Sequence, residues 1–152
     1  MYGISNITSC RNLVLLFLAL TGFDGKVYSS PTPMSITDLL QQVIEAHYYA
    51  IGENRLDEAM GYYHSQSPEI VQTRENIVYG FSQYLLRTTT MSFCYAGQED
   101  EFAVVTAKHR YLMISGIKFI EHIVDVDYQL RREQESWKIW TQRDSSNVSS
   151  SC

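Results

Sequence analysis

Two histidines and two tyrosines occupy alternating positions in two long stretches rich in valine, isoleucine and other β-prone residues. Side chains two residues apart in a strand share one face of the sheet. His109 and Tyr111 therefore share a face in the first stretch, and His122 and Tyr128 share a face in the second. Both faces are otherwise apolar, which assigns them to the interior of the predicted fold.

Imidazole and phenol groups in an apolar cleft can support acid–base chemistry. A histidine there can act as a general base near neutral pH, because its unperturbed pKa is about 6.5, and a tyrosine hydroxyl can stabilise a developing oxyanion. The candidate catalytic groups are His109, His122, Tyr111 and Tyr128. Together with Tyr48, which a preceding predicted helix supplies beside His47, they form the candidate ligand-binding set. The alternative is that all are core residues satisfied by local hydrogen bonds, as most buried polar groups are.

Other reaction classes have weaker motifs. His47, His109 and His122 are conceivable zinc ligands, but they lack a ligand spacing such as H-x-x-x-H, so we predict no metal site. Cys94 has no neighbouring histidine in the sequence that would activate it as a nucleophile. The sequence contains no glycine-rich phosphate loop, and we therefore expect no nucleotide or other cofactor.

The acidic residues of the second stretch fall on the opposite face. Glu121, Asp125 and Asp127 alternate with the inward set, and Lys108 and Arg110 occupy the matching face of the first stretch. Opposite charges on neighbouring strands pair favourably at a solvated surface. We therefore expect an acidic stripe in solvent and no carboxylate base on the inward faces. These three carboxylates could serve as bases only if the assignment of the two faces were reversed.

Composition limits the class of protein. The chain has 152 residues, with 12 Lys+Arg against 17 Asp+Glu and a net charge of −5. This length favours a single domain. A hydrophobic content of 45% with 19% charged residues argues against disorder. The acidic balance argues against a nucleic-acid partner, which would require clustered Lys and Arg.

An uncharged apolar run covers residues 12–23 and follows Arg11. It is shorter than the roughly 20 residues that span a membrane, but it has the length of a signal-peptide core. Modest side chains at 27–29 permit cleavage before Ser30, so we predict a signal peptide at 1–29 and export to the periplasm or medium. The mature chain would then have no stable membrane span. An uncleaved N-terminal anchor is the alternative.

Cleavage would leave two cysteines in the mature chain, Cys94 and Cys152. In an oxidising compartment they could pair, because Cys152 ends a Ser-rich tail (145–152) of wide reach. The alternative is a buried Cys94 with a free or intermolecularly paired tail thiol.

The pattern along the chain predicts an α+β fold, with N-terminal helices packed on a curved antiparallel sheet of about four strands, a cone-like barrel. A Pro-containing linker at 30–34 precedes this domain, which covers 35–144. The expected helices lie at 36–51, 56–63 and 73–87, and the expected strands at 91–95, 102–114, 117–132 and 137–143.

Four stretches of the chain carry a family resemblance. They are residues 45–59, 102–105, 126–130 and 136–140. With them, the region 36–143 resembles the nuclear-transport-factor-two-like (NTF2-like) superfamily, the cone fold of ketosteroid isomerase, scytalone dehydratase and SnoaL-type cyclases. The resemblance implies a pocket between the long first helix and the concave face of the sheet. The segment 63–69, followed by Phe81 and Tyr84, looks like exported bacterial members, many of which have no assigned chemistry.

The strand expected at 117–132 has apolar residues on both faces near its start, with Ile117, Phe119 and Ile123 opposite Ile120 and Val124. An antiparallel sheet with one wet face should not show this pattern. Burial of the second face against another subunit would explain it, and the resemblance likewise implies a homodimer through the sheet. The preferred function is non-catalytic binding of a small apolar ligand or a protein partner. The alternative is a pocket enzyme of isomerase, dehydratase or cyclase type.

Overall fold

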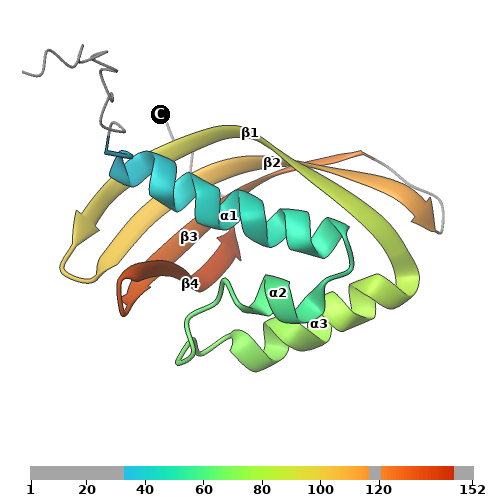
Figure 1. Cartoon of the computed structure of the whole chain (residues 1–152). Coiled ribbons are helices and arrows are strands. Elements are labelled where there is room, and N and C mark those ends of the chain that lie inside the picture. The colour runs from blue at the N-terminus through green and yellow to red at the C-terminus, as the bar shows by residue number, and fades with distance from the viewer. Residues whose placement is uncertain (1–32, 117–120, 146–152) are drawn as a thin grey trace, which may run out of the picture. The chain divides into compact units, whose positions relative to one another are not determined.

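The computed structural model describes residues 33–116 and 121–145, which belong to one compact unit, Pro33–Cys152. Three helices precede four strands (Figure 1), which confirms the predicted α+β order. The elements are α1 (Ile36–Gly52), α2 (Leu56–Met60), α3 (Ile70–Gln83), β1 (Tyr84–Glu99), β2 (Phe102–Gly116), β3 (His122–Glu133) and β4 (Ser136–Asp144). The predicted signal peptide at 1–29, the start of the linker and the end of the tail lie outside the described residues.

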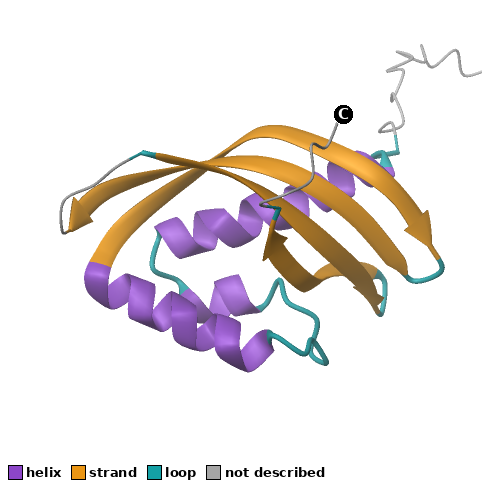
Figure 2. Cartoon of the chain, turned by 180° about the vertical axis from the view of Figure 1, so that it is seen from behind, coloured by secondary structure: helices purple, strands orange, loops and turns teal. Residues whose placement is uncertain are grey.

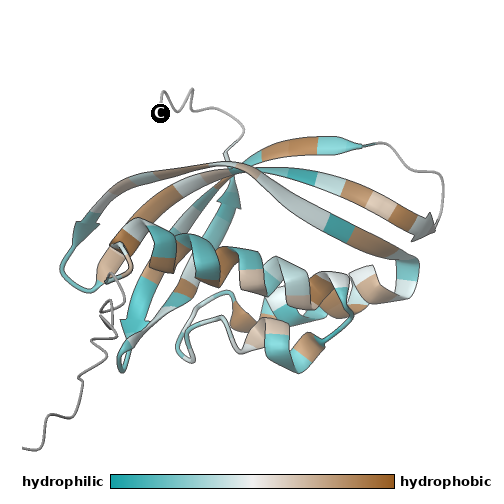
Figure 3. Cartoon of the chain, turned by 45° about the horizontal axis from the view of Figure 1, so that its top comes forward, coloured by the Kyte–Doolittle hydropathy of each residue, from teal (hydrophilic) through white to brown (hydrophobic). Residues whose placement is uncertain are grey.

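Helix α1 begins with a capping box. The Ser35 hydroxyl accepts a hydrogen bond from the Asp38 backbone N–H at 3.1 Å, and the Asp38 carboxylate accepts one from the Ser35 backbone N–H at 3.3 Å. Hydrophobic residues recur along the helix between hydrophilic ones (Figure 3). This places Leu40, Ile44 and Tyr48 on the buried side that faces the sheet.

The end of α1 differs from the expectation that Gly52 would adopt the left-handed conformation. Gly52 is the last helical residue, and Asn54 takes the positive φ, at 56°. Gly52 is needed for a different reason, since a Cβ there would lie 3.3 Å from the carbonyl oxygen of Leu86. The missing side chain allows α1 to approach β1 closely.

The third helix and the first strand meet at a different boundary from the predicted one. The sequence predicts a helix over 73–87 and a short strand at 91–95, but α3 ends at Gln83 and β1 begins at Tyr84. The β-branched run from Thr88 to Thr90 pairs with β2, with Thr90 opposite His109. This long-range pairing outweighs the helical spacing of the apolar residues before it.

The sheet has the order β1-β2-β3-β4, and every neighbouring pair is antiparallel. Three register shifts interrupt the pairing of β1 with β2, and such bulges increase twist and bend a strand. The sheet is therefore strongly curved but open, and α1 crosses its concave face (Figures 1 and 2). The core lies between them and includes Ile44, Val105, Leu130 and Ile139, each fully buried.

The loop between α2 and α3 covers the β4 edge of the sheet. Tyr63 forms a parallel bridge with Ile139, whose backbone N–H donates to Tyr62 O at 2.8 Å and whose carbonyl accepts from His64 N–H at 2.9 Å. Further along the loop, the Glu69 carboxylate accepts a hydrogen bond from the backbone N–H of Gln142 at 3.0 Å. These bonds protect an exposed edge and fix the start of α3 against the sheet.

The outer face of the sheet carries the predicted acidic stripe. Lys108 pairs with Asp125 at 3.4 Å, and Arg110 pairs with Glu121 at 2.6 Å. Ile123 is 51% exposed on this face, whereas residues 117–120, on which the predicted dimer contact also depends, lie outside the described residues. The homodimer therefore stays a prediction. Within the described ranges, no helix is long and apolar enough to cross a membrane.

Candidate functional site

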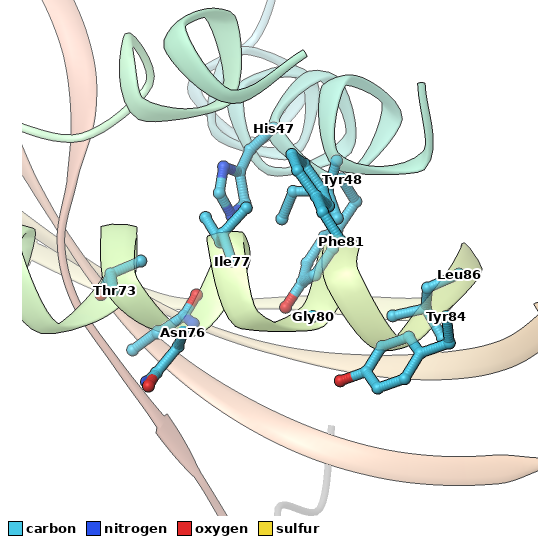
Figure 4. A pocket seen from close by; sticks show the side chains of 11 residues that line it. His47, Tyr48, Thr73, Asn76, Ile77, Gly80, Phe81, Tyr84 and Leu86 are labelled. Atoms are coloured by element: carbon cyan, nitrogen blue, oxygen red, sulfur yellow. The ribbon is translucent and has the colours of Figure 1, made fainter. Parts of the chain in front are cut away.

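A cavity of about 170 Å³ lies between α1 and α3, beside the start of β1 (Figure 4). Helix α1 and helix α3 form its two long walls, and two residues of β1 and one of β4 complete it. The lining residues are His47, Tyr48, Ile51, Thr73, Asn76, Ile77, Gly80, Phe81, Tyr84, Leu86 and Gln142.

The walls of this α1–α3 cavity are mainly apolar and aromatic, as is typical of small-molecule sites. Ile77 and Phe81 project from α3 toward α1 (Figure 4). Gly80, in the last turn of α3, contributes no side chain, and a Cβ there would lie 3.5 Å from the hydroxyl of Tyr84. The glycine thus leaves open space where an ordinary helical residue would occupy it.

His47 is a buried histidine that lines the cavity from α1. Its Nδ1 lies 3.0 Å from the carbonyl oxygen of Ala59. Because a carbonyl only accepts hydrogen bonds, Nδ1 carries the proton in the neutral ring and Nε2 keeps its lone pair. Burial lowers the pKa of His47 to about 4, although the bond to Ala59 opposes this shift. His47 is therefore neutral at physiological pH.

Behind Tyr48 lies a buried chain of hydrogen bonds, here called the tyrosine–histidine cluster. The Tyr48 hydroxyl lies 3.0 Å from that of Tyr111 and 2.8 Å from that of Tyr128. The Tyr128 hydroxyl also lies 2.8 Å from His109 Nε2, and His109 Nδ1 lies 3.3 Å from Thr90 Oγ1. The cluster joins α1 to β1, β2 and β3 through the core.

Burial keeps every member of the cluster uncharged. It raises the pKa of the Tyr48 and Tyr128 hydroxyls well above the usual value near 10. Burial, followed by the nearby charge of protonated His47, lowers the pKa of His109 to about 4. Both ring nitrogens of His109 have partners within the protein, and the residue is fully buried. The cluster cross-links the core, and of its members only Tyr48 lines the cavity.

The structure thus separates the sequence-predicted site residues. Tyr48 lines the cavity, and His109, Tyr111 and Tyr128 connect to it through the cluster. The prediction that His122 faces the interior is wrong, because this side chain is exposed. His122 is the first residue of β3, opposite Tyr111, and the paired ends of β2 and β3 project beyond α1 (Figure 1).

The histidines considered as zinc ligands in the sequence are not grouped into a metal site by the described part of the chain. Over residues 33–116 and 121–145, no three His, Cys, Asp or Glu side chains are grouped in a way that could hold a metal ion. Cys94 is disulfide-bonded. Its predicted partner Cys152 lies outside the described residues, so the pairing of these two cysteines stays a prediction.

The sequence analysis missed the residues that α3, β1 and β4 contribute to the cavity. Helical spacing identified α3 but not the side that would face α1. Gly80 was the one available signal, because a glycine inside a helix costs about 1 kcal/mol relative to alanine and often marks a position with a packing or functional role.

The sequence model of one protein family, described as "Anti-sigma-I factor RsgI9, C-terminal domain", matches residues 42–150. The chain belongs to this family. The match to the RsgI9 C-terminal domain includes most of α1 and every later helix and strand. No curated protein matches the sequence.

Solved structures show that this RsgI9-type domain has the NTF2-like fold. A candidate dehydratase of the NTF2-like family from Streptomyces avermitilis is 13% identical, with a TM-score of 0.62 over 74% of this chain and 96% of the other. A protein of unknown function with a cystatin-like fold from Nostoc punctiforme is 8% identical, with a TM-score of 0.61 over 74% and 93%.

A third relative is an NTF2-like protein of unknown function from Shewanella oneidensis. It is 13% identical, with a TM-score of 0.55 over 71% of this chain and 97% of the other. At these identities the likeness concerns the fold alone, because unrelated functions share one fold. It confirms the resemblance identified from the sequence.

Proposed function

We propose that this domain binds a small, mainly apolar ligand in the α1–α3 cavity and catalyses no reaction on it. The observation that carries the proposal is an aromatic cavity backed by polar groups that already hydrogen-bond to one another. The described lining of the cavity offers no accessible acid–base pair of the kind that an enzyme of this fold would require.

Two features of the cavity support binding over catalysis. Among the described lining residues there is no aspartate or glutamate. His47 is the single lining histidine, and its pKa of about 4 makes it a weak base at neutral pH. His109, the stronger sequence-based candidate, is enclosed behind Tyr48.

The proposal places the domain outside the cytoplasm and in a regulatory protein. The apolar run at 12–23 supports export. The family description, the C-terminal domain of an anti-sigma-I factor, supports a role as the ligand-binding part of a regulator.

Toluene tests the cavity directly, because it is a small apolar probe of suitable size. At tenfold excess over its dissociation constant, a bound ligand stabilises the folded state by about 1.4 kcal/mol. This corresponds to a rise in Tm of roughly 4 to 8 °C for a domain of this size. Gly80→Leu fills the cavity and should abolish the rise in a thermal melt.

Val71→Leu provides the matched control, since Val71 lies on the same helix and is 68% exposed. This variant should keep the full response to toluene. An equal Tm rise in wild type and Gly80→Leu would place toluene elsewhere, and no rise in wild type would contradict the proposed function.

A further inference from the structure

One buried hydrogen-bond acceptor of the α1–α3 cavity has no donor among the described residues. Gln142 lines the cavity, and its Oε1 is buried without a partner there. The bond from its backbone N–H to Glu69 holds this residue in place. A buried acceptor without a donor is costly, so a ligand that supplies a donor gains affinity.

The charge of the lining selects a neutral ligand. Among the described lining residues there is neither a lysine nor an arginine to pair with an anion, and no carboxylate to pair with a cation. Thr73, Asn76 and Tyr84 also line the cavity, but their polar groups donate as well as accept and therefore select no particular partner. Burying an unpaired charge here would be unfavourable.

The volume and the walls indicate a single flat ring. A cavity of about 150 Å³ engineered into another protein holds one benzene molecule, and this cavity has about 170 Å³. Tyr48, Phe81 and Tyr84 present aromatic rings to it (Figure 4). Aromatic pairs prefer edge-to-face or offset contacts, which a flat ring can make.

We propose that the ligand of the α1–α3 cavity is a neutral single-ring phenol whose one hydroxyl donates a hydrogen bond to Gln142 Oε1. This inference rests on the proposed function and adds the chemical class of the ligand. The ring packs against Ile77 and Phe81, which form the α3 wall.

Calorimetric titration of the full chain with phenol, toluene and benzoate tests the inference. Phenol and toluene differ by one hydroxyl in place of a methyl group, and phenol is the more strongly hydrated, so a cavity without acceptors favours toluene. We expect phenol to bind wild type at least as tightly as toluene, and benzoate not to bind. Gln142→Met should weaken phenol roughly tenfold, the value of about one hydrogen bond, and leave toluene within about twofold.

Gln129→Met, on β3 of the same sheet, is the control and should change neither affinity. Toluene binding tighter than phenol by tenfold, or an unchanged phenol-to-toluene ratio in Gln142→Met, would overturn the phenol assignment while leaving the binding function intact. If neither compound binds, both proposals fail. If Gln142→Met does not fold, the relative affinities of phenol and toluene for the wild-type protein still test the phenol assignment.

Discussion

Replacing Tyr128 with phenylalanine is expected to lower the free energy of unfolding by about 2 to 4 kcal/mol. The Tyr128 hydroxyl joins Tyr48 and His109 at 2.8 Å each, and all three side chains are buried. Removing it breaks two hydrogen bonds and leaves His109 Nε2 without a partner, and each buried unsatisfied group costs about 1–3 kcal/mol. Urea denaturation of wild type and variant measures the difference, which is large against a typical total of about 5–15 kcal/mol.

Tyr79→Phe is the control for this experiment, because Tyr79 is 66% exposed on α3. It should change stability by less than about 0.5 kcal/mol. A double-mutant cycle with His109→Leu should show strong coupling, since the two residues share a buried bond. Additive effects, or a loss below 1 kcal/mol in Tyr128→Phe, would show that the cluster does not hold the core together.

Lowering the pH from 6.5 to 5 is expected to destabilise the protein by about 3 kcal/mol in total, near 1.5 kcal/mol for each of two histidines. The folded-state pKa values of His47 and His109 are lowered to about 4, against 6.5 in the unfolded chain. Between these values the unfolded chain binds protons that the folded chain does not. The stabilising contribution of the two neutral histidines is therefore present above pH 6.5 and is lost as the pH falls toward 4.

Denaturation at closely spaced pH values measures how the free energy of unfolding changes between pH 6.5 and pH 5. This range lies above the pH at which Asp and Glu side chains ordinarily titrate. His47→Gln and His109→Gln should each remove about half of the pH dependence. His122→Asn is the matched control substitution, because His122 is exposed and lies outside the tyrosine–histidine cluster. A flat profile in wild type would mean that both imidazoles are charged or solvated in the folded state.

The order of the elements and the inward face of β2 could be predicted from the sequence, because both depend on local spacing. Alternation correctly placed His109 inside. Alternation shows which face of a strand a residue occupies but not whether a helix covers that part of the strand. His122 was therefore assigned to the interior, although the start of β3, where it lies, is exposed. The boundary at Tyr84 was missed because strand pairing across the sheet decides it.

The resemblance implied a pocket between the first helix and the concave face of the sheet, whereas the α1–α3 cavity lies between two helices. Tyr48 was expected to line the pocket and lines this cavity, whereas Gln142 contributes to it from β4, far along the chain. Its position depends on the bond between its backbone and Glu69, a contact between a loop and an edge strand. No periodicity within a single segment encodes such a contact.

Intermolecular nuclear Overhauser effects between toluene and methyl-labelled protein test most directly whether the α1–α3 cavity is the binding site. We predict effects from the toluene protons to the methyl groups of Ile51, Ile77 and Leu86, which line the cavity from three elements. Effects confined to Val104 and Ile123, which are exposed, would contradict the claim, as would the absence of any effect at saturating toluene.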